Sequence, residues 1–216
     1  MIKRFLLWKA GCTSIPAALG HTALERQRLA GRIAACPGPF VEGTMGAMGE
    51  FAKHEPAGYE CPFCALGAGR DTNLSDQRHI VERTDATFTI ISPRFWPNNR
   101  GALIVVPLDH HENLYVLPDH LGAAVHSAAR RGAIALKKAY GCDGTSTRQH
   151  NEPAGNQDVW HYHVHVFPRF DRDNLYRSEI GGLLTKEEMT QYASRIREQL
   201  AGTPSGSGPI SREGAF

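Results

Sequence analysis

The chain has 216 residues, of which 41% are hydrophobic and 21% charged, and its 24 Lys and Arg against 22 Asp and Glu give a formal net charge of +2. This balance excludes a chain-wide basic field that would hold a nucleic-acid polymer or a membrane surface. No stretch approaches the roughly 20 apolar residues that a membrane-spanning helix needs. We therefore expect neither a nucleic-acid polymer nor a membrane as partner.

The N-terminal quarter of the chain differs in composition from the rest. Residues 1–58 are rich in Ala, Gly and Pro and have no sustained apolar period, apart from a possible short helix near Ala23 to Ala35. Residues 202–216 have the Gly, Ser and Pro content of a flexible tail. We predict a poorly structured N-terminal extension (1–58), one domain (59–201) and a flexible C-terminal tail (202–216).

The cysteines and the N-terminus bear on the compartment. Five cysteines are too few, and odd in number, for a disulfide scaffold, so we expect a reducing, cytoplasmic environment. The first acidic residue is Glu25, a pattern that also resembles an organellar transit peptide. Both locations stay open.

The first predicted elements of the domain are two strands. Thr87 to Ile91 and Ala102 to Val106 are β-branched and apolar runs, and prolines, asparagines and a glycine separate them. We expect a hairpin. Apolar residues then recur at helical spacing from Asp119 until Gly141, which predicts a helix of about five turns.

The second half of the domain alternates strand and loop before a final helix. We expect strands near Thr145 to His150 and from Val159 to Phe167, with a loop containing Pro153 between them. Thr185 and Glu188 form a capping-box pattern ahead of an amphipathic helix that reaches Leu200. Because the order is not a regular βαβ alternation, the fold class is α+β with an antiparallel sheet.

Three histidines alternate in the segment from Trp160 to Arg169. In an extended strand His161, His163 and His165 share one face, while Tyr162, Val164 and Val166 point to the opposite, packed face. Such a strand would hold a row of imidazoles on a rigid element. A solvent-facing strand with unrelated histidines is one alternative, and a metal site is another.

The pattern His-x-His-x-His followed by two apolar residues resembles the motif of the histidine triad (HIT) hydrolases and transferases, among them bacterial diadenosine polyphosphate hydrolase-like members. The loop from Asn151 to Val159, Pro168-Arg169, and the segment Gly101 to Leu114 are similar to the flanks of that motif. The resemblance covers roughly residues 58 to 180. It implies an antiparallel sheet of about five strands with two main helices, a homodimer, and action on nucleoside phosphate esters, anhydrides or phosphoramidates.

The resemblance also implies roles for individual residues. His163 would attack the α-phosphorus to form a nucleotidyl-histidine, His165 would stabilise phosphate and assist the leaving group, and His161 would orient them. Other residues would bind the substrate: Asn151, Gln157 and the backbone of Gly155 at phosphate oxygens, and Ser92 under the ribose.

Some positions depart from the family pattern. Ala102 stands where the family often has histidine, and Leu108-Asp109 stand where a basic residue is common. These departures leave the substrate open. Arg169 and Arg172, just past the triad, are candidate polyphosphate contacts or simply solvated arginines.

Cys61 and Cys64 have the spacing at which two thiolates share a metal in a tight turn. Thiol redox chemistry and two merely structural cysteines are the alternatives. The resemblance favours zinc, with His110 and His161 completing the site. A closed Cys2His2 site would be structural and would not activate water.

Taken together, we predict a hydrolase or nucleotidyltransferase that cleaves at the α-phosphate of a nucleoside phosphoramidate or dinucleoside polyphosphate, with structural zinc and no organic cofactor. The alternative is a non-catalytic dimeric module that binds nucleotide or zinc. The intact triad favours the enzyme, because a binding module has no need of a nucleophile.

Overall fold

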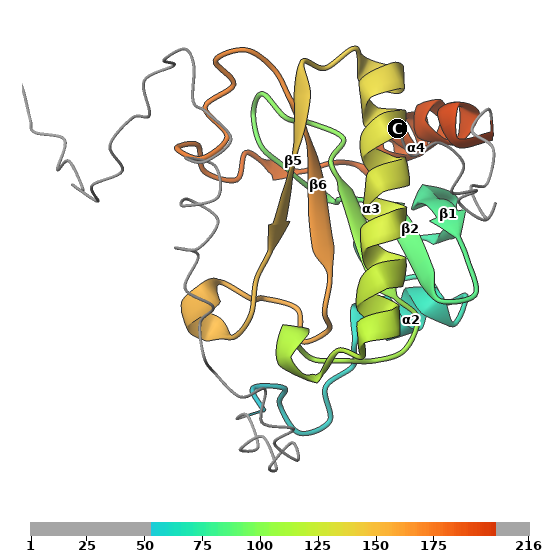
Figure 1. Ribbon diagram of the computed structural model, residues 1–216, viewed down its shortest axis with the longest axis vertical. Helices are drawn as coiled ribbons and strands as arrows, with labels where there is room; N and C mark the ends of the chain where they lie inside the picture. The colour runs from blue at the N-terminus through green and yellow to red at the C-terminus, as the bar shows by residue number, and fades with distance from the viewer. Residues whose placement is uncertain (1–52, 202–216) are drawn as a thin grey trace, which may run out of the picture. The chain divides into compact units, whose positions relative to one another are not determined.

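The computed structural model describes residues 53–201, and a five-stranded antiparallel sheet forms its centre (Figure 1). The strands are β1 Ile80–Arg83, β2 Thr87–Ile91, β4 Leu103–Pro107, β5 Gly144–Gln149 and β6 Val164–Arg169, in the spatial order β1-β2-β4-β6-β5. Two short strands, β3 Arg94–Phe95 and β7 Gly182–Leu183, pair separately. The α+β class with about five sheet strands is confirmed.

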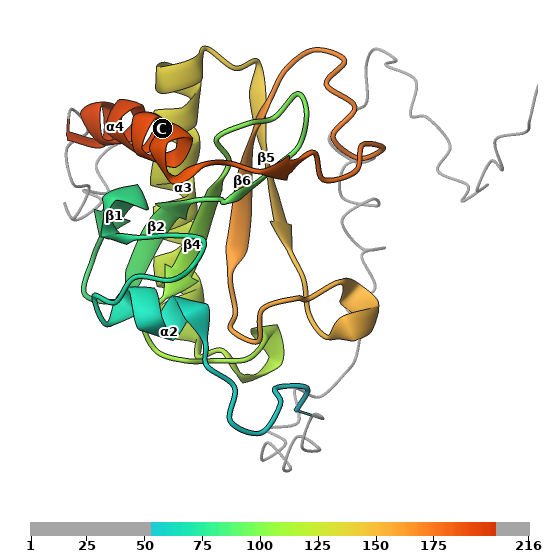
Figure 2. The same cartoon turned by 180° about the vertical axis from the view of Figure 1, so that it is seen from behind.

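Helices cover both faces of this sheet. The long helix α3 (Asp119–Tyr140) and α4 (Lys186–Ala201) pack on one face, and α3 lies in front of the sheet in Figure 1. The short α2 (Pro62–Gly67) lies against the other face, seen in Figure 2. Single 3-10 turns occur at η1 Gln77–His79, η2 Leu114–Val116 and η3 Pro153–Gly155. None of the helices within residues 53–201 has the length and apolar content to span a membrane.

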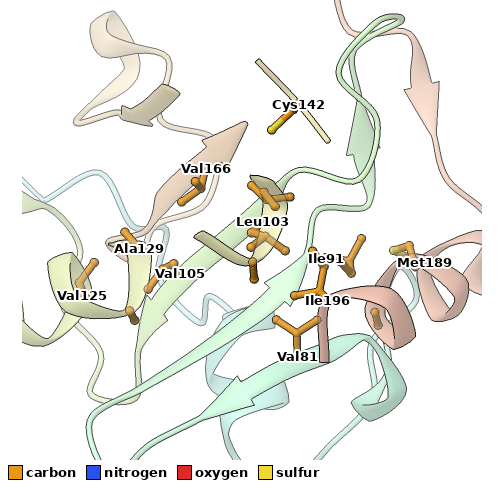
Figure 3. Packing of buried hydrophobic residues seen from close by; sticks show 14 of the residues in the cluster. Val81, Ile91, Leu103, Val105, Val125, Ala129, Cys142, Val166, Met189 and Ile196 are labelled. Carbon is orange, nitrogen blue, oxygen red and sulfur yellow. The ribbon is translucent and has the colours of Figure 1, made fainter. Parts of the chain in front are cut away.

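The main hydrophobic core lies between the sheet and the pair α3 and α4 (Figure 3). Alternate residues of each central strand point into it, among them Ile91, Leu103, Val105 and Val166, together with Met189 and Ile196 from α4. Tyr162 and Val164 pack against the same core, as the period-two pattern predicts.

The intervening residues of the same strands face the other way. Phe88, Ile90, Ile104 and Val106 meet α2 in a second cluster, and His165 belongs to this face. Both β2 and β4 are buried throughout, because each is covered on both sides. This second face is the one that carries the candidate site.

Several predicted elements match the structure closely. The strand 87–91 is β2, and it pairs antiparallel with β4 as expected of a hairpin. The helix α3 ends at Gly141, whose φ of 63° is the left-handed conformation that glycine favours at a helix end. At α4 the backbone N–H of Thr185 donates to Glu188 Oε2 at 2.8 Å and that of Glu188 to Thr185 Oγ1 at 3.2 Å, the predicted capping box.

The predicted strand 159–167 is wrong at its start, since β6 begins only at Val164. The preceding backbone turns: the N–H of His161 donates to the carbonyl of Val159 at 2.8 Å, and that of Tyr162 donates to the carbonyl of His111 at 2.6 Å. These hydrogen bonds take the place of the sheet hydrogen bonds that a strand would make at His161 and Tyr162. The sequence reasoning also missed α2, β1, β3 and β7.

The proposed extension and tail lie mostly outside the described residues, as does the possible helix near 23–35, and these remain predictions. Residues 53–58 are described, and they contact the domain. The backbone N–H of His54 donates to Glu112 Oε1 at 2.8 Å, and Glu55 contacts His110.

Candidate functional site

A cavity of about 610 Å³ opens on the sheet face opposite α3. One part of its lining is apolar and comes from α2 and the central strands, including Phe63, Leu66, Ile90 and Ile104. Another part is polar or charged: Ser92, Arg94, Arg148, His150, Asn156, Gln157, Asp158, His163 and His165. A cavity with an apolar floor and a few convergent polar groups is the usual form of a small-molecule site.

His163 is held in one orientation at this cavity. Its Nδ1 lies 2.7 Å from the backbone carbonyl oxygen of His161, and its ring packs edge-on to Phe63 with centroids 5.1 Å apart. A carbonyl oxygen can only accept, so Nδ1 carries the proton and Nε2 keeps its lone pair. Burial lowers the pKa of His163, which favours this neutral form. His163 therefore presents an unprotonated ring nitrogen.

His165 is the second triad member at the cavity. Its ring centroid lies 5.1 Å from that of His163, and it stacks on Phe167 at 5.7 Å. The Nδ1 atom of His165 is buried and has no hydrogen-bond partner within residues 53–201. A buried nitrogen without a hydrogen-bond partner carries a desolvation cost.

His161 does not line the cavity, although the sequence pattern places all three histidines on one face. Because the strand starts later, its side chain turns toward α2, where Nδ1 lies 3.3 Å from Cys61 Sγ and 3.6 Å from Cys64 Sγ. It reaches the cavity only through its carbonyl, which orients His163.

The side chains of Cys61, Cys64, His110 and His161 form one cluster. Their ligand atoms all lie within 4.8 Å of one another, and Cys64 Sγ is 3.2 Å from His110 Nδ1. Bonds of roughly 2.0 to 2.3 Å to one tetrahedral zinc ion give ligand separations of about 3.5 Å, close to these sulfur–nitrogen distances. The donor set therefore fits zinc.

Outer contacts of the cluster orient both imidazoles for a metal. His161 Nε2 donates to the carbonyl of Pro107 at 3.1 Å, and His110 Nε2 donates to Glu55 Oε2 at 2.7 Å. Each ring thus carries its proton on Nε2 and turns the Nδ1 lone pair to the sulfurs. Burial and the neighbouring His110 lower the pKa of His161 to about 3, so this imidazole is neutral, as a metal ligand must be.

The cluster and the cavity share the helix α2. Cys61 caps the helix, accepting a hydrogen bond from the N–H of Cys64 at 3.4 Å, and Phe63 lies between the two cysteines. The Phe63 ring contacts both His161, at 5.9 Å between centroids, and His163, at 5.1 Å. Any ion held at the cluster would fix the side of the cavity against which His163 packs.

The loop residues predicted to bind substrate occupy different places. Gln157 lines the cavity, but its amide is used internally, donating to the carbonyls of Glu112 at 2.5 Å and Val159 at 3.0 Å. Asn151 does not line the cavity; its Oδ1 accepts from the N–H of Leu114 at 2.8 Å. These two side chains hold the loop in shape and are not free donors.

Gly155 and Ser92 are likewise engaged. The carbonyl of Gly155 accepts from His150 Nδ1 at 2.6 Å, and its N–H donates to the carbonyl of Glu152 at 3.1 Å. Ser92 is buried, lines the cavity, and donates its hydroxyl to the carbonyl of Arg94 at 2.8 Å. Of the two, only Ser92 lies where a ligand could reach it.

Four charged or titratable residues at the cavity were missed by the sequence reasoning: Arg94, Arg148, His150 and Asp158. Arg148 lies near the end of β5, His150 directly follows that strand, and Arg94 pairs with Asp158 in the cavity lining. The available signal was the position of Arg148 and His150 two residues apart on a predicted strand. In contrast Arg169 and Arg172, the candidate polyphosphate contacts of the sequence, pair with Asp173 and Asp171 outside the lining.

Comparison with known proteins gives an independent result. The family model described as HIT domain matches residues 77–172. An uncharacterized HIT-like protein of Methanocaldococcus jannaschii is 32% identical over 115 residues, covering 52% of this chain and 81% of the relative. An Arabidopsis thaliana protein named adenylylsulfatase HINT3 is 28% identical over 148 residues, 67% of this chain and 72% of the relative.

A solved structure also matches this chain. The crystal structure of a Zn-bound histidine triad family protein from Mycobacterium smegmatis has a TM-score of 0.54 and 26% identity, and the match covers 66% of this chain and 94% of that one. The chain therefore belongs to the HIT family.

Proposed function

We propose that this protein is a nucleotide hydrolase or nucleotidyltransferase that cleaves at the α-phosphate of a nucleoside phosphoramidate or dinucleoside polyphosphate. Membership of the HIT family supports the general class of nucleotide hydrolases and transferases. The observation that carries the proposal is the state of His163, a neutral imidazole fixed by the carbonyl of His161 at 2.7 Å beside a cavity of about 610 Å³.

In the first proposed step the Nε2 lone pair of His163 attacks the α-phosphorus. The bond from phosphorus to the leaving group breaks, and its electron pair goes to the leaving atom. In the second step water attacks the same phosphorus, the phosphorus–nitrogen bond breaks, and the electron pair returns to Nε2 while a proton of the water is released. A nitrogen nucleophile suits this reaction because it brings no negative charge to an anionic phosphate.

The nucleoside would occupy the apolar part of the cavity. Phe63, Leu66, Ile90 and Ile104 offer a surface for a base, and Ser92 lies beside them. Because Asn151 and Gln157 are engaged within the loop, the exposed amide of Asn156 at the cavity is the side-chain donor that we assign to phosphate oxygens.

We also propose that Cys61, Cys64, His110 and His161 hold a structural zinc ion. The ion would supply a cross-link between α2 and the triad segment and no open coordination position for water. The support is the donor set and its outer contacts, together with a zinc-bound relative of known structure.

The homodimer expected from the resemblance is also a proposal. Leu114 and Val116 on η2 are large apolar side chains that are 48% and 51% exposed, a surface that a second subunit could cover. Light scattering on the purified chain would give twice the chain mass if this is right and the monomer mass if it is not.

The test of the function is turnover of adenosine phosphoramidate, diadenosine tetraphosphate and adenosine phosphosulfate, the last chosen for the name of the Arabidopsis relative. His163→Ala should lower the release of AMP by roughly three orders of magnitude or more and abolish a trapped nucleotidyl-protein. His126→Ala, an exposed histidine on α3, is the control. Nucleotide binding without any turnover would favour the non-catalytic module.

A further inference from the structure

A row of side chains crosses the cavity floor from strand to strand. The ladder pairs Ile90 with Ile104, Ile104 with His165, and His165 with Arg148. Directly paired residues of antiparallel strands share a face, and all four line the cavity. The row therefore runs from apolar side chains through His165 to a guanidinium, so the two ends of the cavity suit different parts of a substrate.

Arg148 has no acidic partner within the described part of the chain. The neighbouring arginines do: Arg94 pairs with Asp158, and Arg169 pairs with Asp173. Arg148 instead donates Nη2 to the carbonyl of Leu175 at 3.1 Å. A half-buried guanidinium without a counter-ion is electrostatically incomplete.

Aromatic rings hold the Arg148 guanidinium in place. Its Cζ lies 5.0 Å from the centroid of Phe167, 4.8 Å from that of Tyr176 and 5.9 Å from that of Trp96. Phe167 in turn stacks on His165. The cation is therefore held in position next to the triad before any ligand arrives.

His165, beside it, is neutral at ordinary pH and so lacks the extra proton that a leaving group would need. Burial lowers the pKa of His165 well below its ordinary value, and the positive charge of Arg148 acts in the same direction. Its buried Nδ1 also has no hydrogen-bond partner in residues 53–201. This end of the cavity offers a fixed positive charge and a neutral imidazole.

We infer that Arg148 binds the leaving group and makes the enzyme selective for leaving groups that depart as oxyanions, such as phosphate, sulfate or a nucleotide, over amines. The inference rests on the proposed function. When an anhydride P–O bond breaks, its electron pair stays on an oxygen that is stable as an anion, so no proton is required and a cation stabilises the product. When a P–N bond breaks, the nitrogen must take a proton, and Arg148 has none to give.

The experiment compares kcat/KM for adenosine phosphosulfate and adenosine phosphoramidate in Arg148→Met. We expect a loss of about 10- to 100-fold for the phosphosulfate, the range of one hydrogen bond to a charged group, and less than about 3-fold for the phosphoramidate. Arg148→Lys keeps the charge but not the planar fork and should recover part of the loss. It also serves as the test if the Met variant does not fold.

Arg195→Met is the matched control. Its guanidinium lies 4.8 Å from the ring of Tyr140 and donates to the carbonyl of Ala139 at 2.7 Å, much as Arg148 does with Tyr176 and Leu175, but it does not line the cavity. This variant should leave both substrates unaffected.

Calorimetric binding of inorganic pyrophosphate separates this inference from the proposed function. Arg148→Met should bind pyrophosphate at least about 10-fold more weakly than wild type and AMP equally well. Equal losses on both substrates, or unchanged pyrophosphate binding, would overturn the role of Arg148 and leave the proposed function standing. A wild type that binds pyrophosphate through Arg148 but shows no turnover dependent on His163 would overturn the proposed function and support the anion site.

Discussion

Replacing Asp173 by alanine should destabilise the turn that follows the triad strand. The Asp173 carboxylate is 1% exposed and accepts from Arg169 Nε at 2.7 Å, Arg169 Nη2 at 2.9 Å, Asn99 Nδ2 at 2.8 Å and the backbone N–H groups of Phe170 and Leu175 at 3.0 Å each. The substitution removes the acceptor of Arg169 Nε and Nη2 and of both backbone N–H groups, while Asn99 keeps the carbonyl of Pro168 and Arg169 Nη1 keeps Ser146 Oγ.

The expected cost follows from that burial. Removing one partner of a buried ion pair costs about 3 to 5 kcal/mol, and the 22% exposure of the Arg169 side chain places the value near the lower end. A loss of about 3 kcal/mol corresponds to a fall in Tm of roughly 6 to 12 °C for a domain of this size. Urea unfolding followed by circular dichroism gives the free energy of unfolding directly.

Asp171→Ala is the matched control for this measurement. Asp171 is 79% exposed and pairs with Arg172, which is 89% exposed, so the change should cost no more than about 0.5 kcal/mol. If Asp173→Ala is no more destabilising than Asp171→Ala, the reasoning from buried hydrogen bonds is wrong.

The stability lost in Asp173→Ala should depend on pH. The Arg169 guanidinium holds the pKa of Asp173 well below its usual range. A carboxyl whose pKa is depressed in the folded state contributes stability above its unfolded pKa of about 3.9 and loses it as the pH falls toward the folded value. The difference in stability between wild type and Asp173→Ala should therefore be constant from about pH 5 to 8 and shrink below about pH 4.

Three further predictions concern the metal cluster, the loop and the long helix. Cys64→Ser should lower bound zinc, measured by atomic emission on tag-free protein, to well below one ion per chain; full occupancy would argue against the cluster as the site. Gln157→Ala should reduce the free energy of unfolding by about 1 to 3 kcal/mol, because two carbonyls lose a buried donor; a raised KM with unchanged stability would instead indicate a direct substrate contact. On α3, Gly122→Ala should stabilise the fold by up to about 1 kcal/mol, since the new Cβ would meet only Leu117 at 3.8 Å. Gly132→Ala should instead destabilise the fold by about 1 to 3 kcal/mol, because the new Cβ would lie 2.9 Å from the buried Leu103. Thermal melts that rank the two variants in the opposite order would contradict the packing argument.

Elements with a local pattern could be predicted from the sequence. The helix α3 shows an apolar period and a terminal glycine, α4 has its capping box, and β2 is a continuous β-branched run. Each signal depends on residues a few positions apart, so the local chain is enough to specify it. The triad is likewise visible as three histidines at a spacing of two.

Residues whose role depends on distant partners could not be placed in this way. His161 leaves the row of histidines because its ring contacts Cys61, one hundred positions earlier, and donates to the carbonyl of Pro107. Gln157 looks like a phosphate donor in the sequence, yet carbonyls of Glu112 and Val159 use its amide.

Arg148 is the clearest case of the difference. The sequence shows an arginine in a polar strand, whereas the fold sets it opposite His165 and among three aromatic rings from other parts of the chain. Strand register, burial and the choice among competing hydrogen-bond partners arise from contacts between segments far apart in the chain. The sequence therefore specifies the chemical groups of the site. How the sheet pairs and how α2 packs against it decide which of these groups join the cysteine–histidine cluster and which line the cavity.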